Sequence, residues 1–350
     1  MAAFSNIDEV NEHVESLVTC LKRGEINGSY NVAMKTVLVL RKAVGQLRWG
    51  NAKELMEFVR LAGQKLVEAQ PSEAAVGNMV RRILKIIKEE YATAIGKTED
   101  GTSGSLQGFL LSEKKSGDFT GSVPLLKSII VDAINELISE LETSIDNIAA
   151  QALEHIHSNE VIMTMGASRT VEKFLKNAAR KRKFSVIVAE CAPYYHGQNL
   201  AKRLAETGVE TTLIADAAIF AIMARVNKVI IGADTVMADG GLKVVSGCGA
   251  LALAAKHHSV PLIVCGALFK LSPQYVCSYD QDNINKFLSP HDVMDFSEGH
   301  LLSRISITNP AFDYITPDLV NLYISDVGGN APSYVYRLLS ELYHPDDYII

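Results

Sequence analysis

The second half of the chain alternates short apolar runs with amphipathic segments, and this alternation constrains the fold more than any other feature. Five runs rich in β-branched residues have the length of buried strands: 161–164, 184–189, 211–214, 229–231 and 262–264. The segments between them have the length and periodicity of helices. Strands and helices in alternation predict a parallel sheet with helices on both faces. We therefore expect a Rossmann-like α/β domain over 158–350.

The first half of the chain is predicted to be all-helical. Apolar residues keep a 3.6-residue period across 8–91, and no strand pattern occurs there. The stretch 96–123 is dense in Gly, Ser, Thr, Lys and Glu, so we expect a mobile loop at the end of an N-terminal domain over 1–123. A long amphipathic helix should join the two domains within 124–157, where roughly 30 residues at ~1.5 Å each span ~45 Å.

Composition narrows the functional classes. The chain has 350 residues, of which 48% are hydrophobic and 21% charged, enough for a sizeable core and two domains. Its net charge of −6 argues against broad nucleic-acid binding, which needs a basic face. The five cysteines are typical of free thiols in a reducing compartment. The longest apolar stretch, 260–269, is far shorter than the ~20 residues of a membrane helix. We expect a soluble cytosolic protein without nucleic-acid or membrane partners.

Motifs for cofactors and metals do not occur in the sequence. No GxGxxG follows the first predicted strand, and no GxxxxGK[ST] is present, so a nucleotide site is not expected. The cysteines show neither CxxC nor the Cys/His spacing of a metal site. We therefore expect no cofactor and no metal.

Acidic residues and a cysteine stand where the predicted strands end. Glu190 and Cys191 follow the second strand, Asp216 the third and Asp234 the fourth. Ligands bind at this end of open α/β sheets, so the side chains could form a crevice for acid–base chemistry. For Asp216 we favour the alternative of an N-cap for the helix expected over 217–225. Cys191 is expected to be buried and unreactive, because no neighbouring cation or helix N-terminus lowers its pKa.

Several segments resemble a known protein family. They are 78–87, 147–160, 168–172, 188–193, 228–249 and 251–258. Over most of its length the chain is similar to the family that unites two kinds of protein. One kind is sugar-phosphate isomerases, such as methylthioribose-1-phosphate and ribose-1,5-bisphosphate isomerases. The other is the alpha, beta and delta subunits of translation initiation factor 2B, and the C-terminal run 328–347 is most similar to the beta branch.

The catalytic positions of the isomerases distinguish the two branches. The isomerases use a cysteine after the first sheet strand and the aspartate of a Gly-Ala-Asp turn, and an Asn-Lys pair helps to hold phosphate. Asp234 matches the aspartate, but Gly166 stands at the cysteine position. Val244 and Val245 stand at the phosphate-binding pair. Because glycine transfers no proton and valine offers no charge, the resemblance implies a non-catalytic chain.

The resemblance also implies the partners. Beta subunits form a core with alpha and delta relatives, delta most directly, and the gamma and epsilon subunits dock on that core. Epsilon replaces GDP by GTP on initiation factor 2, and the core senses phosphorylation of the alpha subunit of that factor. The implied role of this chain is core assembly and sensing of that phosphorylation.

Two alternatives stay open. The chain could be a sugar-phosphate aldose–ketose isomerase. It could also keep a relic pocket, with Asp234, Glu190, Cys191 and Asp216, that binds a sugar phosphate or nucleotide as a regulator. In that case backbone N–H groups of the glycine-rich loop would hold the anion at a helix start.

Two sets of residues are candidates for contact with partners. Candidates for the subunit interface are Asn159, Val161, Ile187, Thr212, Ile214, Asn330 and Tyr334. Ordinary sheet core is an equal alternative for each of them. Arg81, Arg82, Lys85 and Lys88 lie at spacings that put several of them on one face of an N-terminal helix, and Arg and Lys are the usual ligands of phosphoserine. We hypothesise that this basic face borders the phosphorylated partner, with a solvated face as the alternative.

Overall fold

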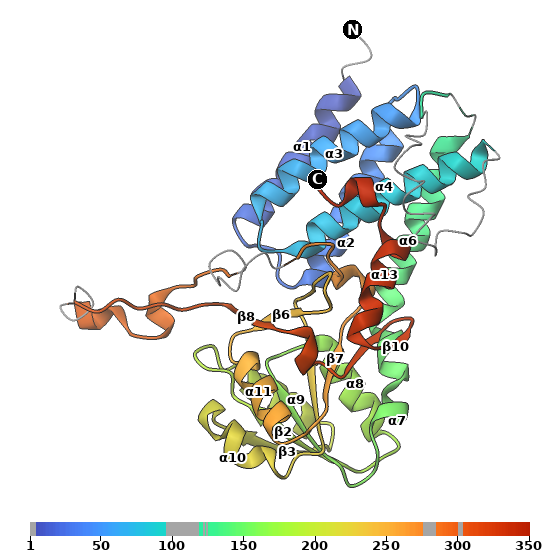
Figure 1. Ribbon diagram of the computed structural model, residues 1–350. Coiled ribbons are helices and arrows are strands. Elements are labelled where there is room, and N and C mark those ends of the chain that lie inside the picture. The colour runs from blue at the N-terminus through green and yellow to red at the C-terminus, as the bar shows by residue number, and fades with distance from the viewer. Residues whose placement is uncertain (1–4, 96–118, 122, 124, 276–284, 300–303) are drawn as a thin grey trace. The chain divides into compact units, whose positions relative to one another are not determined.

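The computed structural model describes residues 5–95, 119–121, 123, 125–275, 285–299 and 304–350. The described residues divide into two compact units (Figure 1). The first unit combines Met1–Leu141 with Ser340–Ile350, and the second is Glu142–Leu339. The predicted loop over 96–123 lies largely outside the described residues.

The first unit is helical, as predicted. Its helices are α1 (Ser5–Lys22), α2 (Ser29–Gln46), α3 (Ala52–Ala69), α4 (Ala74–Ala94) and the first part of α6 (Leu126–Ala150). Asn51 caps α3, because its side-chain oxygen accepts a 2.9 Å hydrogen bond from Glu54 N. α3 and α4 approach closely at Gly63, where a β-carbon would lie 2.6 Å from Val80 Cγ1. A larger side chain at position 63 would force the two helices apart.

The long helix is shorter than predicted. α6 ends at Ala150, and a separate short helix, α7 (Ala152–His155), follows. At ~1.5 Å per residue, the 25 residues of α6 span about 38 Å, compared with the expected ~45 Å. Gln151 separates the two helices, and its side-chain amide donates a 2.7 Å hydrogen bond to Ser325 O. The interruption therefore coincides with a tertiary contact, which periodicity does not reveal.

The second unit is built on a seven-stranded sheet with the strand order β10-β9-β7-β4-β1-β2-β3. Its strands are β1 (Val161–Met165), β2 (Ser185–Ala189), β3 (Glu210–Ile214), β4 (Lys228–Gly232), β7 (Leu262–Cys265), β9 (Leu322–Ser325) and β10 (Gly328–Asn330). All neighbouring strands are parallel except β10, which is antiparallel to β9. All five predicted strands are present, so the predicted fold class is confirmed.

Helices surround this sheet. They are α8 (Arg169–Ala179), α9 (His196–Ala205), α10 (Ile219–Met223), α11 (Cys248–His257) and α13 (Val335–Leu342). α8, α9 and α11 contact strands of the sheet, and α10 packs on α11. Ser168 caps α8, as predicted, by accepting a 3.4 Å hydrogen bond from Val171 N.

A second, smaller sheet contains part of the glycine-rich stretch 240–249, which follows Asp234 in the sequence. It is formed by β5 (Thr235–Val236), β6 (Leu242–Val245) and β8 (Phe312–Ile315), in the order β5-β6-β8. Gly240 turns the chain between β5 and β6 with φ of +84°, and a β-carbon there would lie 2.7 Å from Pro332 O. This stretch was expected to be a loop; instead it supplies the middle strand of a sheet.

The C-terminal residues depart from the predicted domain plan. The sequence places everything from 158 to 350 in the α/β domain, but Ser340–Ile350 belongs to the first unit. The physical reason is that Tyr343 and Asp347, each 1% exposed, are buried there. The other division falls inside α6, after Leu141, and not at position 124.

Candidate functional site

The strand-end residues lie where the sequence predicts. Gly166 follows β1, Cys191 follows β2, Asp216 follows β3 and Asp234 follows β4. Glu190 precedes Cys191, and its backbone N–H continues the pairing with β3. Because these strands are parallel neighbours, the four positions share the carboxyl end of the sheet.

Asp216 binds a neighbouring loop and does not cap the helix that follows it. Its Oδ1 accepts a 2.9 Å hydrogen bond from Cys191 N, and its Oδ2 accepts a 2.7 Å bond from Ala192 N. The N-cap position of the following 3-10 helix (Asp216–Ala218) is Ala215. The predicted capping role is therefore wrong. Cys191 has a left-handed φ of +62°, and this loop conformation accompanies the two amide bonds to Asp216.

The two cysteines near this loop are poor nucleophiles. Cys191 is 2% exposed, and burial followed by the charge of Asp216 raises the pKa of its thiol to about 11. Burial also raises the pKa of the Cys248 thiol, and Cys191, Asp313 and Asp216 add to that shift. Both thiols are protonated at neutral pH, whereas a nucleophilic cysteine needs its thiolate.

Asp234 belongs to a different group of side chains. Its Oδ2 lies 3.7 Å from Lys243 Nζ and accepts a 3.3 Å hydrogen bond from the Thr235 hydroxyl. Lys243 is 6% exposed, and its Nζ lies 4.1 Å from the centre of the Phe312 ring. Lys243 was not predicted as a site residue, although a lysine between the apolar residues of β6 was the available signal. The carboxylate that matches the isomerase aspartate is thus neutralised within the chain.

Gly166 lies beside one of the valines that replace the phosphate-binding pair. The residue has a φ of +78°, and a β-carbon on it would lie 4.0 Å from Val245 Cγ2. Val244 is fully buried, and Val245 is 38% exposed. The positions that match the isomerase cysteine and phosphate ligands are therefore close in space, and none of them bears a polar side chain.

The amides at the start of α11 are already bound. Asp313 Oδ2 accepts hydrogen bonds of 2.7 Å from Gly247 N and 3.0 Å from Gly249 N. These are N–H groups of the kind on which the relic-pocket alternative depends. Asp313 comes from β8, more than 60 positions along the chain, and was not predicted as a site residue. The carboxylate satisfies the donors that an external phosphate would use.

Comparison with known proteins identifies the family. A sequence model described as the initiation factor 2 subunit family matches residues 25–332. The chain belongs to the initiation factor 2 subunit family. The matched residues include Gly166 and Asp234, which stand at the two catalytic positions of the isomerases. They also include most of both compact units.

Named members of the initiation factor 2 subunit family agree on the branch. A Dictyostelium discoideum protein named translation initiation factor eIF2B subunit beta is 46% identical, over 95% of both chains. The protein of that name from Schizosaccharomyces pombe is 40% identical, over 99% of both. A chain in the crystal structure of the tetrameric eIF2B-beta2-delta2 complex from Chaetomium thermophilum superposes with a TM-score of 0.73 and 30% identity, covering 95% of both chains. The predicted similarity to the beta branch is confirmed.

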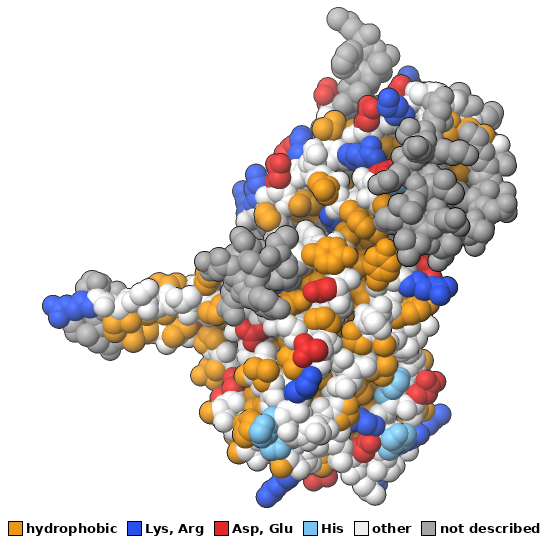
Figure 2. All heavy atoms as spheres, in the orientation of Figure 1, with side chains coloured by type: hydrophobic (Ala, Val, Ile, Leu, Met, Phe, Trp, Pro, Cys, Tyr) orange, Lys and Arg blue, Asp and Glu red, His pale blue; other side chains and the backbone are white. Residues whose placement is uncertain are grey.

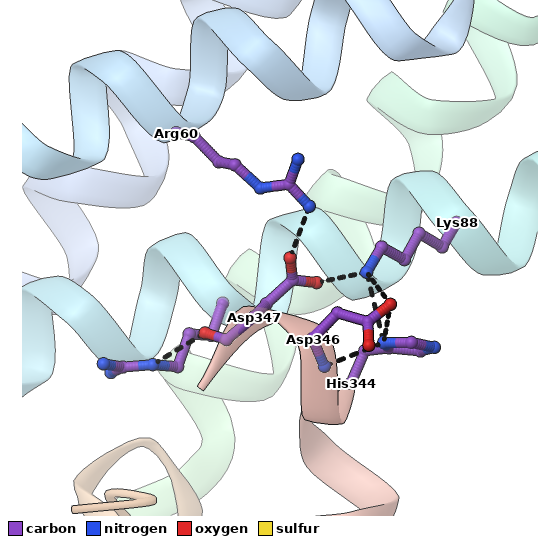
Figure 3. A network of polar contacts seen from close by, with 6 residues as sticks. Arg60, Lys88, His344, Asp346 and Asp347 are labelled. Carbon is purple, nitrogen blue, oxygen red and sulfur yellow. Dashed lines mark hydrogen bonds and ion pairs between the residues drawn. The ribbon is translucent and has the colours of Figure 1, made fainter. Parts of the chain in front are cut away.

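The basic face of this family member is largely occupied by its own C-terminal residues. Arg81 is 6% exposed, and its Nε donates 3.2 Å hydrogen bonds to the carbonyl oxygens of Asp347 and Tyr348. Figure 3 shows the Asp347 carboxylate between Arg60 of α3 and Lys88 of α4, with a distance of 2.7 Å to each. The face exists as predicted, but Arg81 and Lys88 are not presented to a partner.

The other two basic residues are less enclosed. Lys85 Nζ donates to the backbone oxygens of Ser340 and Glu341. Arg82 lies 3.8 Å from Glu140, and its side chain is 21% exposed. Of the four residues in the hypothesis, Arg82 has the contact most easily exchanged for a partner, because an ion pair with a largely exposed carboxylate is weak.

The residues predicted for the subunit interface fall into a buried group and an exposed group. Ile187 and Ile214 are each 9% exposed, and Val161 is half-buried, which agrees with sheet core. Asn159, Thr212 and Tyr334 are exposed, and Asn330 is half-buried in β10. Thr212 lies on β3, which ends the seven-stranded sheet. The structure therefore leaves the exposed members of the set accessible to another subunit.

The described ranges contain neither a metal-binding cluster nor a membrane-spanning helix. No three His, Cys, Asp or Glu side chains there are grouped to hold a metal ion. Among the helices described, none combines the length and apolar character needed to cross a bilayer.

Proposed function

We propose that the chain is a non-catalytic regulatory subunit of the initiation factor 2B complex. In this complex it assembles with alpha, gamma, delta and epsilon subunits, delta most directly, and the complex exchanges GDP for GTP on initiation factor 2. The observation that carries the proposal is Gly166, which stands beside Val245 where the isomerases have a proton-transferring cysteine. The 46% identity to a protein named as a beta subunit supports the same role.

The chemistry of the residues at the strand ends argues against an isomerase. Aldose–ketose isomerisation moves a proton between neighbouring carbons and needs a poised acid and base. Here the Cys191 thiol is protonated, Asp216 holds two backbone amides and Asp234 faces Lys243. A substrate phosphate would also have to displace Asp313 from the amides of Gly247 and Gly249.

The first unit is proposed to sense phosphorylation of the alpha subunit of initiation factor 2. Arg82 is the residue we assign to this role, because its charge is only loosely held by Glu140. A phosphate with two negative charges would attract the guanidinium more strongly than one exposed carboxylate does. The complex is proposed to act in the cytosol, in keeping with free thiols at the described cysteines.

Recovery of the intact complex tests the proposed assembly. The tagged full-length chain is purified from its native cytosol at moderate salt, and its partners are identified by mass spectrometry. We expect four further subunits in near-equal amounts, together with initiation factor 2. Recovery of a homodimer alone would overturn the proposal, and isomerase assays on sugar phosphates would then be the next measurement.

A charge reversal tests the proposed sensing. In the assembled complex, Arg82→Glu should weaken the inhibition of GDP release by phosphorylated initiation factor 2, without changing exchange on the unphosphorylated factor. Glu140→Gln is the matched control, since it breaks the same ion pair but leaves Arg82 in place. Unchanged inhibition in Arg82→Glu would remove Arg82 from the sensing surface.

A further inference from the structure

Four consecutive basic residues lie in the turn between α8 and β2. They are Arg180, Lys181, Arg182 and Lys183, which we call the basic turn. Three of them are exposed and Arg182 is half-buried, and none makes an ion pair with a residue that the structure describes. On the face shown in Figure 2, by contrast, basic and acidic side chains are interspersed in both units. The basic turn thus concentrates positive charge without a counter-charge from the described residues.

The position of the basic turn at a helix end explains only part of its charge. α8 ends at Ala179, and the backbone N–H groups of Lys181 and Arg182 donate to Ala178 O at 3.1 and 3.0 Å. A cation in the last turn of a helix is stabilised by the helix dipole, and Lys176 already stands in the last turn of α8. Four adjacent like charges repel one another, so a bound anion would stabilise the turn.

The loop that joins α7 to β1 lies directly against the basic turn. In this loop Asn159 N donates a 2.7 Å hydrogen bond to Lys183 O, and Arg182 Nη1 donates to His157 Nδ1 at 2.7 Å. Ser158 stands between these two contacts. It is exposed, and its hydroxyl makes no hydrogen bond within the described part of the chain. The Ser158 hydroxyl is therefore accessible for modification, and the basic turn lies beside it.

The other polar side chains of this loop do not neutralise the basic turn. Glu160 Oε1 lies 2.8 Å from Lys228 Nζ, and Glu160 Oε2 accepts a 2.8 Å hydrogen bond from His157 N. A guanidinium can only donate, so the His157 nitrogen that faces Arg182 is an uncharged acceptor. Neither side chain therefore balances the charge of Arg182.

We propose that Ser158 is a phosphorylation site and that the basic turn binds the phosphate. A protein kinase transfers the terminal phosphoryl group of ATP to Ser158 Oγ. The bond between this group and ADP breaks, the Oγ–P bond forms, and the hydroxyl proton passes to the base of the kinase. The product carries a charge of about −1.5 to −2 at neutral pH and three acceptor oxygens, which suit the guanidinium of Arg182 and the ammonium of Lys183.

A phosphate attached at Ser158 has an advantage over a free anion. It is tethered beside the basic turn, so it binds without the loss of translational freedom that a free ligand undergoes. The strands β1 and β2 begin directly after the loop and the turn, and they pair in register from Val161 and Ser185. The bound phosphate would link the segments that lead into these two strands. Phosphorylation should therefore stabilise the second unit.

Phosphopeptide mapping tests whether the modification occurs. The tagged full-length chain is purified from its native cytosol with phosphatase inhibitors and is cleaved after glutamate. Cleavage after Glu154 and Glu160 releases residues 155–160, in which Ser158 carries the only hydroxyl group. We expect mass spectrometry to find this peptide in a phosphorylated form that phosphatase treatment removes. Recovery of the peptide in its unmodified form alone would overturn the proposal.

Thermal unfolding tests whether the basic turn binds the phosphate. Phosphoserine is incorporated at position 158 of the full-length chain, and we expect the melting temperature to rise by about 2 °C or more. The rise should disappear when Arg182→Gln and Lys183→Gln are combined. Lys286→Gln is the control, because it removes one exposed charge from the same unit before β8 and should leave the rise unchanged. No rise, or a rise that survives the double substitution, would overturn the proposal. Both experiments follow this chain alone, so their outcome is independent of the proposed function.

Discussion

Asp347 Oδ2 lies 2.7 Å from Lys88 Nζ, and both side chains are shielded from water, with exposures of 0% and 9%. The opposite oxygen of the carboxylate binds Arg60. One acidic side chain from the C-terminal residues therefore satisfies cations on α3 and on α4. Of the four basic residues that the sequence places on α4, this carboxylate binds Lys88.

Loss of this carboxylate should destabilise the first unit. Asp347→Asn removes the charge that neutralises Lys88. Because a buried charge is destabilising without its partner, we expect the free energy of unfolding to fall by about 3 kcal/mol. Equilibrium urea unfolding measures the change. Asp346→Asn is the control, because the Asp346 side chain is 71% exposed and its Oδ2 lies 3.9 Å from Lys88 Nζ. We expect this variant to lower the free energy of unfolding by less than about 1 kcal/mol. Equal effects in the two variants would contradict the assigned role of Asp347.

Restoring a cysteine at position 166 should not restore an enzyme. Gly166→Cys places a side chain at φ of +78°, which costs about 1–2 kcal/mol. The new thiol would face Val245 without a phosphate ligand beside it. We expect no turnover of ribose 1,5-bisphosphate or methylthioribose 1-phosphate in either the variant or the unaltered chain. Measurable isomerase activity in the unaltered chain would reverse the conclusion about catalysis.

The stability of the second unit should fall at alkaline pH. Burial raises the pKa of Cys191 from 9.0 to about 11, so the folded state holds this proton more tightly than the unfolded state. The resulting stability is fully present below pH 9 and is lost as the pH rises from about 9 to 11. Cys191→Ala should flatten this part of the stability profile. A profile unchanged by the substitution would show that other groups cause the loss.

Removing Asp216 should release the Cys191 loop and make its thiol more reactive. Asp216→Ala leaves two amides without their acceptor, which costs about 1 to 2 kcal/mol, and it removes a charge that raises the pKa of Cys191. Alkylation of Cys191 at pH 8, followed by mass spectrometry, should accelerate at least threefold. Glu210→Ala, an exposed change on β3, should leave the rate unaltered.

Sugar phosphates should not stabilise the unaltered chain. A ligand of the native state raises the melting temperature, but the amides of Gly247 and Gly249 already bind Asp313. Differential scanning fluorimetry with millimolar ribose 1,5-bisphosphate should show a shift of less than about 1 °C. A larger, saturable shift would support the relic-pocket alternative and would indicate a binding site away from these amides.

Sequence patterns predicted the parts of the fold that rest on local apolar periodicity. The five predicted strands and the N-terminal helices are of this kind. Strand β10 has the sequence Gly-Gly-Asn, and β8 is only four residues long with Asp313 inside it, so neither shows the apolar run on which the strand prediction depended. The end of α6 was not predicted for another reason. It coincides with a hydrogen bond from the Gln151 side chain to Ser325 O, which apolar periodicity does not reveal.

The positions of the candidate site residues could be predicted from the sequence, but their side-chain partners could not. Gly166, Cys191, Asp216 and Asp234 lie at strand ends as expected, since topology alone places them there. The partners Lys243 and Asp313 were missed, because these contacts depend on how β6 and β8 pair in the folded chain. The prediction that Asp216 caps a helix was wrong, because its carboxylate accepts hydrogen bonds from the amides of Cys191 and Ala192.

The burial of Asp347 against α3 and α4 also has a consequence for synthesis on the ribosome. Lys88 and Asp347 are 259 positions apart, so the first helices emerge long before the residue that completes them. At roughly 5 to 20 residues per second, the interval is on the order of ten to fifty seconds. During it, Arg81 and Lys88 lack the C-terminal oxygens that they bind in the folded chain, so the fold of the first unit is completed only after the second unit has been synthesised.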